Sequence, residues 1–452
     1  MLKPFENISN RKLRTFEELF YFRNETPPET YKLPFVVYKS ILNDYKKIEL
    51  FKKHLITISH ENNLSKDFYN MALNFKKAAR EAAEFLVNRP NIGKLDTVFF
   101  AVTYMYRQSI ELIMKARVFQ LIEAAQERKE FMTDAAHNLK KIFEVIEART
   151  DEMYKTSESL LWLKTFISNI SKIDLSSDSF RYPYRIIKDH LFETYEFEYV
   201  FNERKDICLE KLINKLDIAF TLMQEQYELN VSGLSLQSDW ETNDHEIAIN
   251  ETYSTDFLEE GGDYYAKSVI GYEYNKSELY LYIQAYQEAA DHLYVKAVEQ
   301  VVSGKESNQK LAGTFYLPIC YLYRNAIELA LKDLCFVTYG YTDALEVIYT
   351  RKHKLESIWN HIKCHYPKYL NIDIPTDHKE EIDKALKLVH EADATSSKFR
   401  YPIDKNLKYY YTNNSRIHLA YDYYNLRHCL NIIEGLTYKT RDYIDSIEVH
   451  YD

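Results

Sequence analysis

Residues 104–116 read YMYRQSIELIMKA, and residues 321–333 read YLYRNAIELALKD. In both strings apolar side chains recur at intervals of three and four, which predicts a helix. The turns that precede the charged positions are aromatic and almost uncharged, as is typical of a helix at the centre of a bundle. Because the same string occurs twice in one chain, the sequence predicts two related helical bundles.

Two further motifs recur in the same order and at almost the same offset. The string HNL at 137–139 corresponds to HKL at 353–355, and FRYP at 180–183 corresponds to FRYP at 399–402. Three motifs in register are not expected by chance, so we interpret the chain as an internal duplication. The predicted organisation is an N-terminal extension (1–69), a first bundle (70–230), an acidic linker (231–278) and a second bundle (279–452).

The composition favours helices throughout. Only 9 of the 452 residues are Gly and 10 are Pro, whereas turn-rich sandwiches, barrels and Rossmann folds need many glycines. We therefore predict an all-α fold, with minor β elements near residues 30–40 and 245–255. The net charge of −10 argues against sequence-independent coating of nucleic acid. The segment 230–266 contains acidic residues and no basic one, which predicts a solvated connector or an acidic flap over a basic groove.

The periodicity places corresponding helices in each bundle. A helix is expected after each His-x-Leu, and FRYP should form a non-helical corner because proline cannot continue a helix. Pro367 is expected to end the helix that follows the second His-x-Leu. The remaining predicted helices are 70–88, 95–125, 160–173 and 206–227 in the first bundle, and 279–300, 309–337, 379–392 and 418–438 in the second.

A charged stripe marks each central helix. Its members are four residues apart and therefore share one face. Charges on a mostly buried helix should be paired, which predicts a structural polar network or a ligand-contacting site. We expect the arginine of FRYP to join this network and to pair with the Glu or Asp of its own bundle. The network residues are Arg107, Glu111, Lys115 and Asp174 in the first bundle, and Arg324, Glu328, Lys332 and Asp393 in the second.

These landmarks resemble the HEPN superfamily of small helical bundles. Many members have an E-x3-K element on a central helix, then an H-x-L at the start of the next helix, then an R-Y-P after a later one. In this chain the order starts with Glu111 and Lys115, and the second copy has the same order. The resemblance covers roughly residues 70–227 and 279–438. The resemblance implies that the two bundles form an intrachain pseudo-dimer, with the functional cleft at their interface.

The resemblance also implies an activity. Active members are metal-independent endoribonucleases of toxin–antitoxin, abortive-infection and CRISPR systems, and they use an R-x4–6-H motif. In that chemistry a histidine moves protons and an arginine stabilises charge on the scissile phosphate. Only Arg185 and His190 fit the motif here, although Ile186 replaces its usual polar second residue. The corresponding part of the second bundle has Lys405 and Asn406 and no histidine.

The expected function is therefore that of an RNA-directed effector in a prokaryotic defence or toxin system, a metal-independent endoribonuclease if active. The alternative is a catalytically inactive tandem bundle that senses a nucleotide or protein and regulates a partner; a purely structural helical protein is a third. The expected partners are RNA, a protein partner or antitoxin, and a second copy of the chain. The candidate catalytic residues are His190, Arg185, Arg181, His137, Arg400 and His353.

The remaining motifs point to no cofactor. His361, Cys364 and His365 would share one helix face, a spacing that zinc accepts, but the first bundle lacks this set and we interpret it as structural. We expect no metal, no cofactor and no membrane span. The five cysteines form no CxxC pair, which together with their odd number favours a reduced, cytoplasmic setting.

Overall fold

The computed structural model describes residues 55–87, 92–150, 157–189, 191, 193–232, 253–271, 279–302 and 306–448. These residues are mostly helical and contain eleven helices and six short strands. The predicted β elements at 30–40 and 245–252 lie outside this part of the chain, and residues 253–255 form no strand. The predicted all-α class is therefore confirmed in its helices and corrected by three small two-stranded sheets.

The first bundle begins with two long helices and ends with a third. Helix α4 buries the face that carries Phe68, Phe75 and its alanines, because these recur at helical spacing. Helix α5 is buried along almost its whole length. The helices are α4 (Leu64–Val87), α5 (Ile92–Leu121), α6 (Ala125–Asp134), α7 (Leu139–Ala148), α9 (Glu158–Ile173) and α10 (Leu209–Ser232).

The second bundle has the same long pair and differs from the prediction at three helix ends, one of them that of α16, which continues past the predicted end at 438. Helix α13 passes the predicted end at 337 and is broken at Gly340, whose φ of 72° favours glycine. Pro367 does not end α14, because it lies in the last turn; Asn371, in a left-handed conformation, ends it instead. The helices are α12 (Tyr280–Val302), α13 (Glu306–Arg351), α14 (Leu355–Leu370), α15 (Thr376–Ala392) and α16 (Leu419–Glu448).

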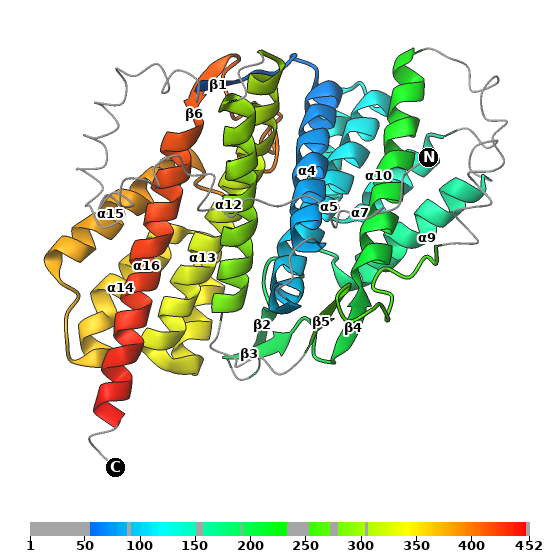
Figure 1. Ribbon diagram of the computed structural model, residues 1–452. Helices are drawn as coiled ribbons and strands as arrows, with labels where there is room; N and C mark the ends of the chain where they lie inside the picture. Colours follow the sequence, from blue (N-terminus) through cyan, green and yellow to red (C-terminus); the bar gives the residue numbers. More distant parts are fainter. Residues whose placement is uncertain are drawn as a thin grey trace.

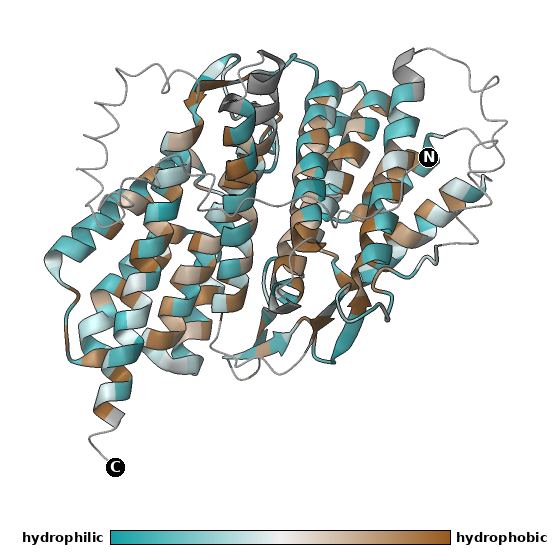
Figure 2. Ribbon diagram, viewed as in Figure 1, coloured by the Kyte–Doolittle hydropathy of each residue, from teal (hydrophilic) through white to brown (hydrophobic). Residues whose placement is uncertain are grey.

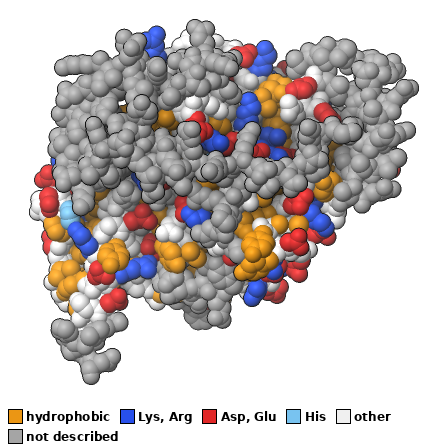
Figure 3. Space-filling model, viewed as in Figure 1, with side chains coloured by type: hydrophobic (Ala, Val, Ile, Leu, Met, Phe, Trp, Pro, Cys, Tyr) orange, Lys and Arg blue, Asp and Glu red, His pale blue; other side chains and the backbone are white. Residues whose placement is uncertain are grey.

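The long helices of both bundles stand side by side (Figure 1). Helices α4, α5, α12 and α13 contact one another and form the junction between the bundles. Tyr104 on α5 stacks on Tyr321 on α13, with ring centroids 4.6 Å apart. Hydrophobic residues face the spaces between helices (Figure 2), and one apolar core runs through both bundles. On the face in Figure 3, acidic and basic side chains of the described residues are interspersed.

Three antiparallel strand pairs join segments that are far apart or connected by a turn. Strand β1 (Leu55–Ile58) pairs with β6 (Ser415–His418), so the described end of the predicted N-terminal extension is attached to the second bundle. Strands β2 (Tyr184–Asp189) and β3 (Thr194–Tyr199) form a hairpin directly after the first FRYP. Strand β4 (Lys205–Cys208) pairs with β5 (Lys267–Ile270), which belongs to the predicted linker.

The described part of the acidic segment is docked on the first bundle. Trp162 donates its indole N–H to the carbonyl of Tyr253 at 2.9 Å. Phe257 is buried beside Phe166 and Phe180, and Glu259 pairs with Lys215 at 3.1 Å. For residues 253–271 the predicted solvated connector is therefore wrong, because aromatic anchors and an ion pair hold the segment in place.

None of the described helices is both long and apolar enough to cross a membrane.

Candidate functional site

Glu111 is the centre of a buried polar cluster in the first bundle. The predicted stripe of Arg107, Glu111 and Lys115 lies on α5, and all three side chains are almost completely buried. Glu111 Oε1 accepts from Lys115 Nζ at 2.7 Å, and Oε2 pairs with Arg107 Nη1. His137 Nδ1 lies 3.1 Å from the same Oε1. The stripe is therefore a paired network.

Arg107 connects this cluster to the turn that precedes FRYP. Its Nε lies 2.9 Å from Asp174 Oδ2, and its Nη2 donates to the carbonyl of His137. Asp174 Oδ1 accepts from the backbone N–H groups of Asp178 and Ser179, at 2.9 and 3.0 Å. The carboxylate thus both pairs the arginine and fixes the corner that presents FRYP.

The second bundle contains the same arrangement around Glu328. Lys332 Nζ and His353 Nδ1 each lie 2.8 Å from Glu328 Oε1, and Arg324 Nη1 lies 3.1 Å from Oε2. Arg324 also donates to the carbonyl of His353 at 2.8 Å. One contact differs, because Arg324 Nε reaches the backbone carbonyl of Asp393, at 3.4 Å, where Arg107 meets a carboxylate.

Each cluster is completed by a tyrosine from the other bundle. Tyr401 donates its hydroxyl to Glu111 Oε1 at 2.8 Å and lies 2.9 Å from His137 Nδ1. Tyr182 donates to Glu328 Oε1 at 2.7 Å and lies 3.1 Å from His353 Nδ1. We call these sets the first cluster (Arg107, Glu111, Lys115, His137, Asp174 and Tyr401) and the second cluster (Arg324, Glu328, Lys332, His353, Asp393 and Tyr182). The sequence reasoning noted both FRYP motifs but missed the role of their tyrosines.

The arginines of the two FRYP motifs are buried behind these tyrosines. Arg181 donates to Tyr182 Oη at 2.7 Å and pairs with Asp178 at 3.1 Å. It therefore joins the second cluster, not the first, and the expected pairing with Glu111 or Asp174 is wrong. Arg400 donates to the carbonyl of Ser396 at 2.6 Å and has no acidic partner within the described residues. Neither arginine is exposed to a ligand in this conformation.

Burial and the cluster charges act in opposite directions on both Glu111 and His137. Burial alone would raise the pKa of Glu111, but Lys115, His137 and Arg107 hold it well below its usual range. The pKa of Glu328 is depressed against burial in the same way, by Lys332, His353 and Arg324. Burial lowers the pKa of His137, an effect that Glu111 partly offsets. At neutral pH Glu111 is thus a carboxylate and His137 a neutral imidazole.

The imidazoles are the accessible members of the clusters. The side chain of His137 is 35% exposed and that of His353 is 40% exposed, whereas the carboxylates beneath them are fully buried. Because Nδ1 of each imidazole faces a carboxylate, we assign the N–H proton of the ring to Nδ1. In the neutral ring of His137, Nε2 then carries the free lone pair, and among the described residues no partner occupies Nε2 of either ring.

The described residues contain only the arginine of the predicted Arg-x4-His pair, so they do not test the pair. Arg185 lies on β2, where its Nη2 donates to Ser179 Oγ at 2.9 Å and to the carbonyl of Ile173 at 3.3 Å. His190 lies outside the described residues. Arg185 is therefore used to hold the corner before FRYP.

The His361, Cys364 and His365 set forms a ring stack rather than a ligand cage. The two imidazoles stack with centroids 4.1 Å apart, and His361 Nδ1 accepts from Arg351 at 2.9 Å. Across the described ranges, no group of three or more His, Cys, Asp or Glu side chains is placed to hold a metal ion.

The fold and the two clusters define a class: a mostly helical protein with two matched buried ion networks, each ending in an accessible histidine. Comparison of the chain with protein-family models, curated proteins and solved structures finds no match. The function is therefore argued from the clusters themselves.

The exchanged tyrosines predict unequal effects on stability. Tyr182→Phe removes a hydroxyl that contacts Glu328, His353 and the buried guanidinium of Arg181, and should lower the free energy of unfolding by about 1–3 kcal/mol. Tyr401→Phe should cost less, about 1 kcal/mol, because among the described residues no arginine bonds that hydroxyl. Urea denaturation of both variants measures the difference. Tyr438→Phe, at an exposed position, is the control, and equal values for all three would contradict the exchange.

Proposed function

We propose that this protein is an RNA-directed effector of a prokaryotic defence or toxin system and that it acts as a metal-independent endoribonuclease. One observation carries the proposal. An accessible imidazole in each cluster has its Nδ1 against a fully buried carboxylate, 3.1 Å away for His137 and 2.8 Å for His353. This is the arrangement that a general acid–base histidine needs, because the carboxylate fixes the ring and its tautomer.

The chemistry follows from the free Nε2. With the Nδ1 proton facing Glu111, His137 Nε2 could accept the proton of an RNA 2′-hydroxyl as it attacks the adjacent phosphate. A protonated histidine could return a proton to the leaving 5′-oxygen. Lys115 and Arg107 keep the carboxylate ionised. The buried Arg181 would act as a positioning residue through its hydrogen bond to Tyr182, and Arg400 through the ring of Tyr401, 5.3 Å from its guanidinium.

The proposed architecture is a pair of HEPN-like bundles that form an intrachain pseudo-dimer. It is supported by the shared order of the motifs and by the reciprocal donation of Tyr182 and Tyr401. The stack of Tyr104 on Tyr321 at the junction adds a further matched contact. On this proposal neither cluster is complete in one bundle alone, so the two bundles would act as one unit. The proposed location is the cytoplasm, and the proposed partners are RNA and a regulatory protein.

A regulatory function is the second candidate. It is favoured by the use of Arg185 as a structural donor to Ser179 and Ile173 and by the lack of an Arg-x4–6-His in the second bundle. A catalytically inactive tandem bundle could sense a nucleotide or protein and pass the signal through the exchanged tyrosines.

Cleavage of RNA without metal distinguishes the two candidates. Purified full-length protein should cut total RNA in EDTA, and His137→Ala/His353→Ala should reduce the rate by about 10²–10⁴-fold. The base must be neutral, and burial lowers the pKa of His137 below its ordinary 6.5. If His137 is that base, its protonation should slow the reaction only below pH 6.5.

The controls separate a trigger requirement from a lack of activity. His378→Ala, on α15 and outside both clusters, should cut like the wild type, whereas full cutting by His137→Ala/His353→Ala would report contaminating nuclease. Sequencing of RNA ends in phage-challenged cells tests a protein that needs an activator. RNA ends that are identical for wild type and the double variant would overturn the nuclease proposal and favour the regulator.

A further inference from the structure

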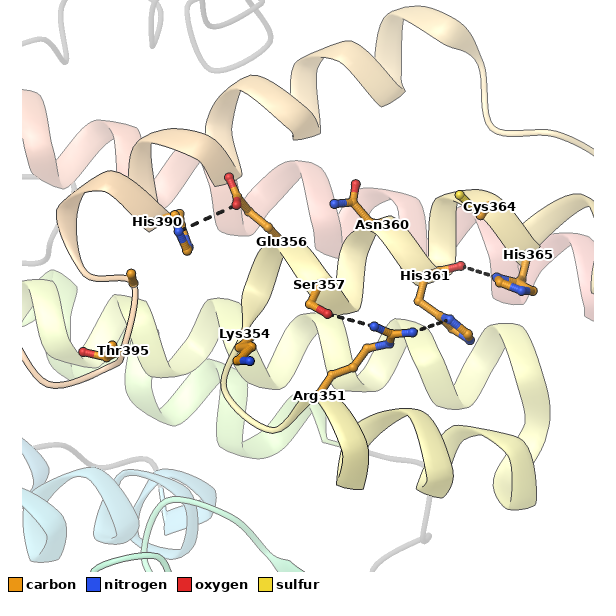
Figure 4. A pocket seen from close by; sticks show the side chains of 11 residues that line it. Arg351, Lys354, Glu356, Ser357, Asn360, His361, Cys364, His365, His390 and Thr395 are labelled. Carbon is orange, nitrogen blue, oxygen red and sulfur yellow. Dashed lines mark hydrogen bonds and ion pairs between the residues drawn. The ribbon is translucent and has the colours of Figure 1, made fainter.

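A basic pocket lies beside the second cluster and is separate from it. It has a volume of about 680 Å³ and opens between the end of α13, α14 as far as His365 and the end of α15 (Figure 4). This volume lies within the range of small-molecule sites. Arg351, Lys354 and three histidines line it, and Glu356 is its one acidic residue. His353 is not part of the lining, although Lys354 follows it directly.

Arg351 supplies an uncompensated positive charge to this pocket. Its Nη1 donates to Ser357 Oγ at 2.8 Å and its Nη2 to His361 Nδ1 at 2.9 Å, so uncharged acceptors hold the guanidinium (Figure 4). Burial, together with His365 and Arg351, lowers the pKa of His361 and keeps that ring neutral. Within the described residues Arg351 forms no ion pair with a carboxylate, and its buried Nε has no partner. A fixed guanidinium of this kind is suited to an anion.

The start of α14 adds backbone donors on the same side. Lys354 is the N-cap of α14 and makes no side-chain capping bond, whereas Asn138, the corresponding residue of the first bundle, caps α7 through the N–H of Lys141 at 3.2 Å. The first turn of α14 therefore keeps its N–H groups for a ligand, and such groups favour negative charge. Glu356 opposes an anion, but it lies 3.8 Å from His390 Nε2 and is directed to that ring.

A pocket of the first bundle differs from this one in charge. It has a volume of about 480 Å³ and four acidic residues against Lys141 and Arg149, and Arg149 is already paired with Glu127. The two pockets thus differ in charge, although the clusters beside them match.

We propose that the pocket of the second bundle binds a phosphate ester through its phosphate group, with Arg351 and Lys354 as its charged contacts and the first turn of α14 as its backbone donor. The ligand is a phosphate ester, either a free nucleotide or the phosphorylated end of an RNA. This inference goes beyond the proposed function, because it holds whether or not the clusters cleave RNA. A ligand on Lys354 would also lie one residue along the chain from His353.

Calorimetric titration of the full-length protein tests the pocket. The ligands are ATP, AMP, adenosine, inorganic phosphate, and a short RNA with either a 5′-phosphate or a 5′-hydroxyl. Phosphorylated ligands should bind more tightly than adenosine and the 5′-hydroxyl RNA. Arg351→Gln should weaken binding about 10- to 100-fold, as expected for loss of a charged hydrogen bond. Preference for AMP over the phosphorylated RNA identifies the free nucleotide as the source, and the reverse identifies RNA.

Two variants keep the result interpretable. Lys354→Asn restores the residue of the first bundle, removes no described contact and should weaken binding several-fold. Arg149→Gln, in the acidic pocket, should bind like the wild type. The inference is overturned if no phosphorylated ligand binds, if adenosine binds as tightly as AMP, or if Lys354→Asn and Arg351→Gln both bind like the wild type.

Discussion

Glu111→Ala should lower the free energy of unfolding by about 3–5 kcal/mol, the range for removing one partner of a buried ion pair. Glu111 is fully buried and contacts Arg107, Lys115, His137 and Tyr401. For Lys115, Glu111 is the only carboxylate partner within the described residues. Removal of Glu111 therefore leaves the buried ammonium of Lys115 without a counter-charge. Arg107 then keeps Asp174 as its one carboxylate partner among the described residues.

Urea denaturation with a matched control measures this effect. Glu127→Ala removes a carboxylate from the solvent-exposed pair with Arg149 and should cost less than about 1 kcal/mol. Glu111→Gln keeps the shape but not the charge and should lie between the two. Similar values for Glu111→Ala and Glu127→Ala would contradict the central position of Glu111.

The same group gives the wild type a characteristic pH dependence. The folded-state pKa of Glu111 lies well below its ordinary value of 4.5, so its stabilising contribution is complete above that value. The contribution is lost as the pH falls through the folded-state pKa, because the unfolded chain then binds the proton first. Glu111→Ala should remove this part of the acid sensitivity and leave the part that comes from Glu328.

The charged stripes could be predicted from sequence because helical spacing and composition are local. Residues four apart share a face, and a charge on an apolar helix needs a partner, so Glu111 with Lys115 and Glu328 with Lys332 follow from the string alone. The exchange of Tyr182 and Tyr401 could not be predicted in this way. The two FRYP motifs have the same sequence whether the tyrosine of each contacts the glutamate of its own bundle or that of the other bundle.

The strands were missed for two different reasons. The hairpin that contains β3 has a local signal, since Tyr195, Phe197 and Tyr199 alternate with glutamates, but the prediction assigns no element between FRYP and the helix expected at 206. The pairing of Leu55 with His418 has no local signal at all. The acidic segment was predicted to be a solvated connector from its charge. Phe257 and the carbonyl of Tyr253 provide contacts with the first bundle that net charge does not reveal.

Gly271→Ala should destabilise the protein by about 3 kcal/mol or more, through steric clash added to the cost of a left-handed backbone. Gly271 has a φ of +70°, and a Cβ there would lie 1.9 Å from the carbonyl oxygen of Glu203. The obstacle is backbone, so it cannot rotate away, and the end of β5 must shift. That strand is bonded to the start of α5, through Ser268 to the carbonyl of Leu95 and through the N–H of Val269 to Asp96 at 2.6 Å.

Gly261→Ala separates the clash from the backbone term. Gly261 lies in the same segment and also has positive φ, at +128°, but a Cβ there would meet no atom within 4 Å. It should therefore cost only about 1 kcal/mol. Denaturation gives both values, and amide hydrogen exchange at Ile270 should rise in Gly271→Ala alone. If the two variants are equally stable, β5 is not held against Glu203, and its described position beside β4 and the start of α5 must be abandoned.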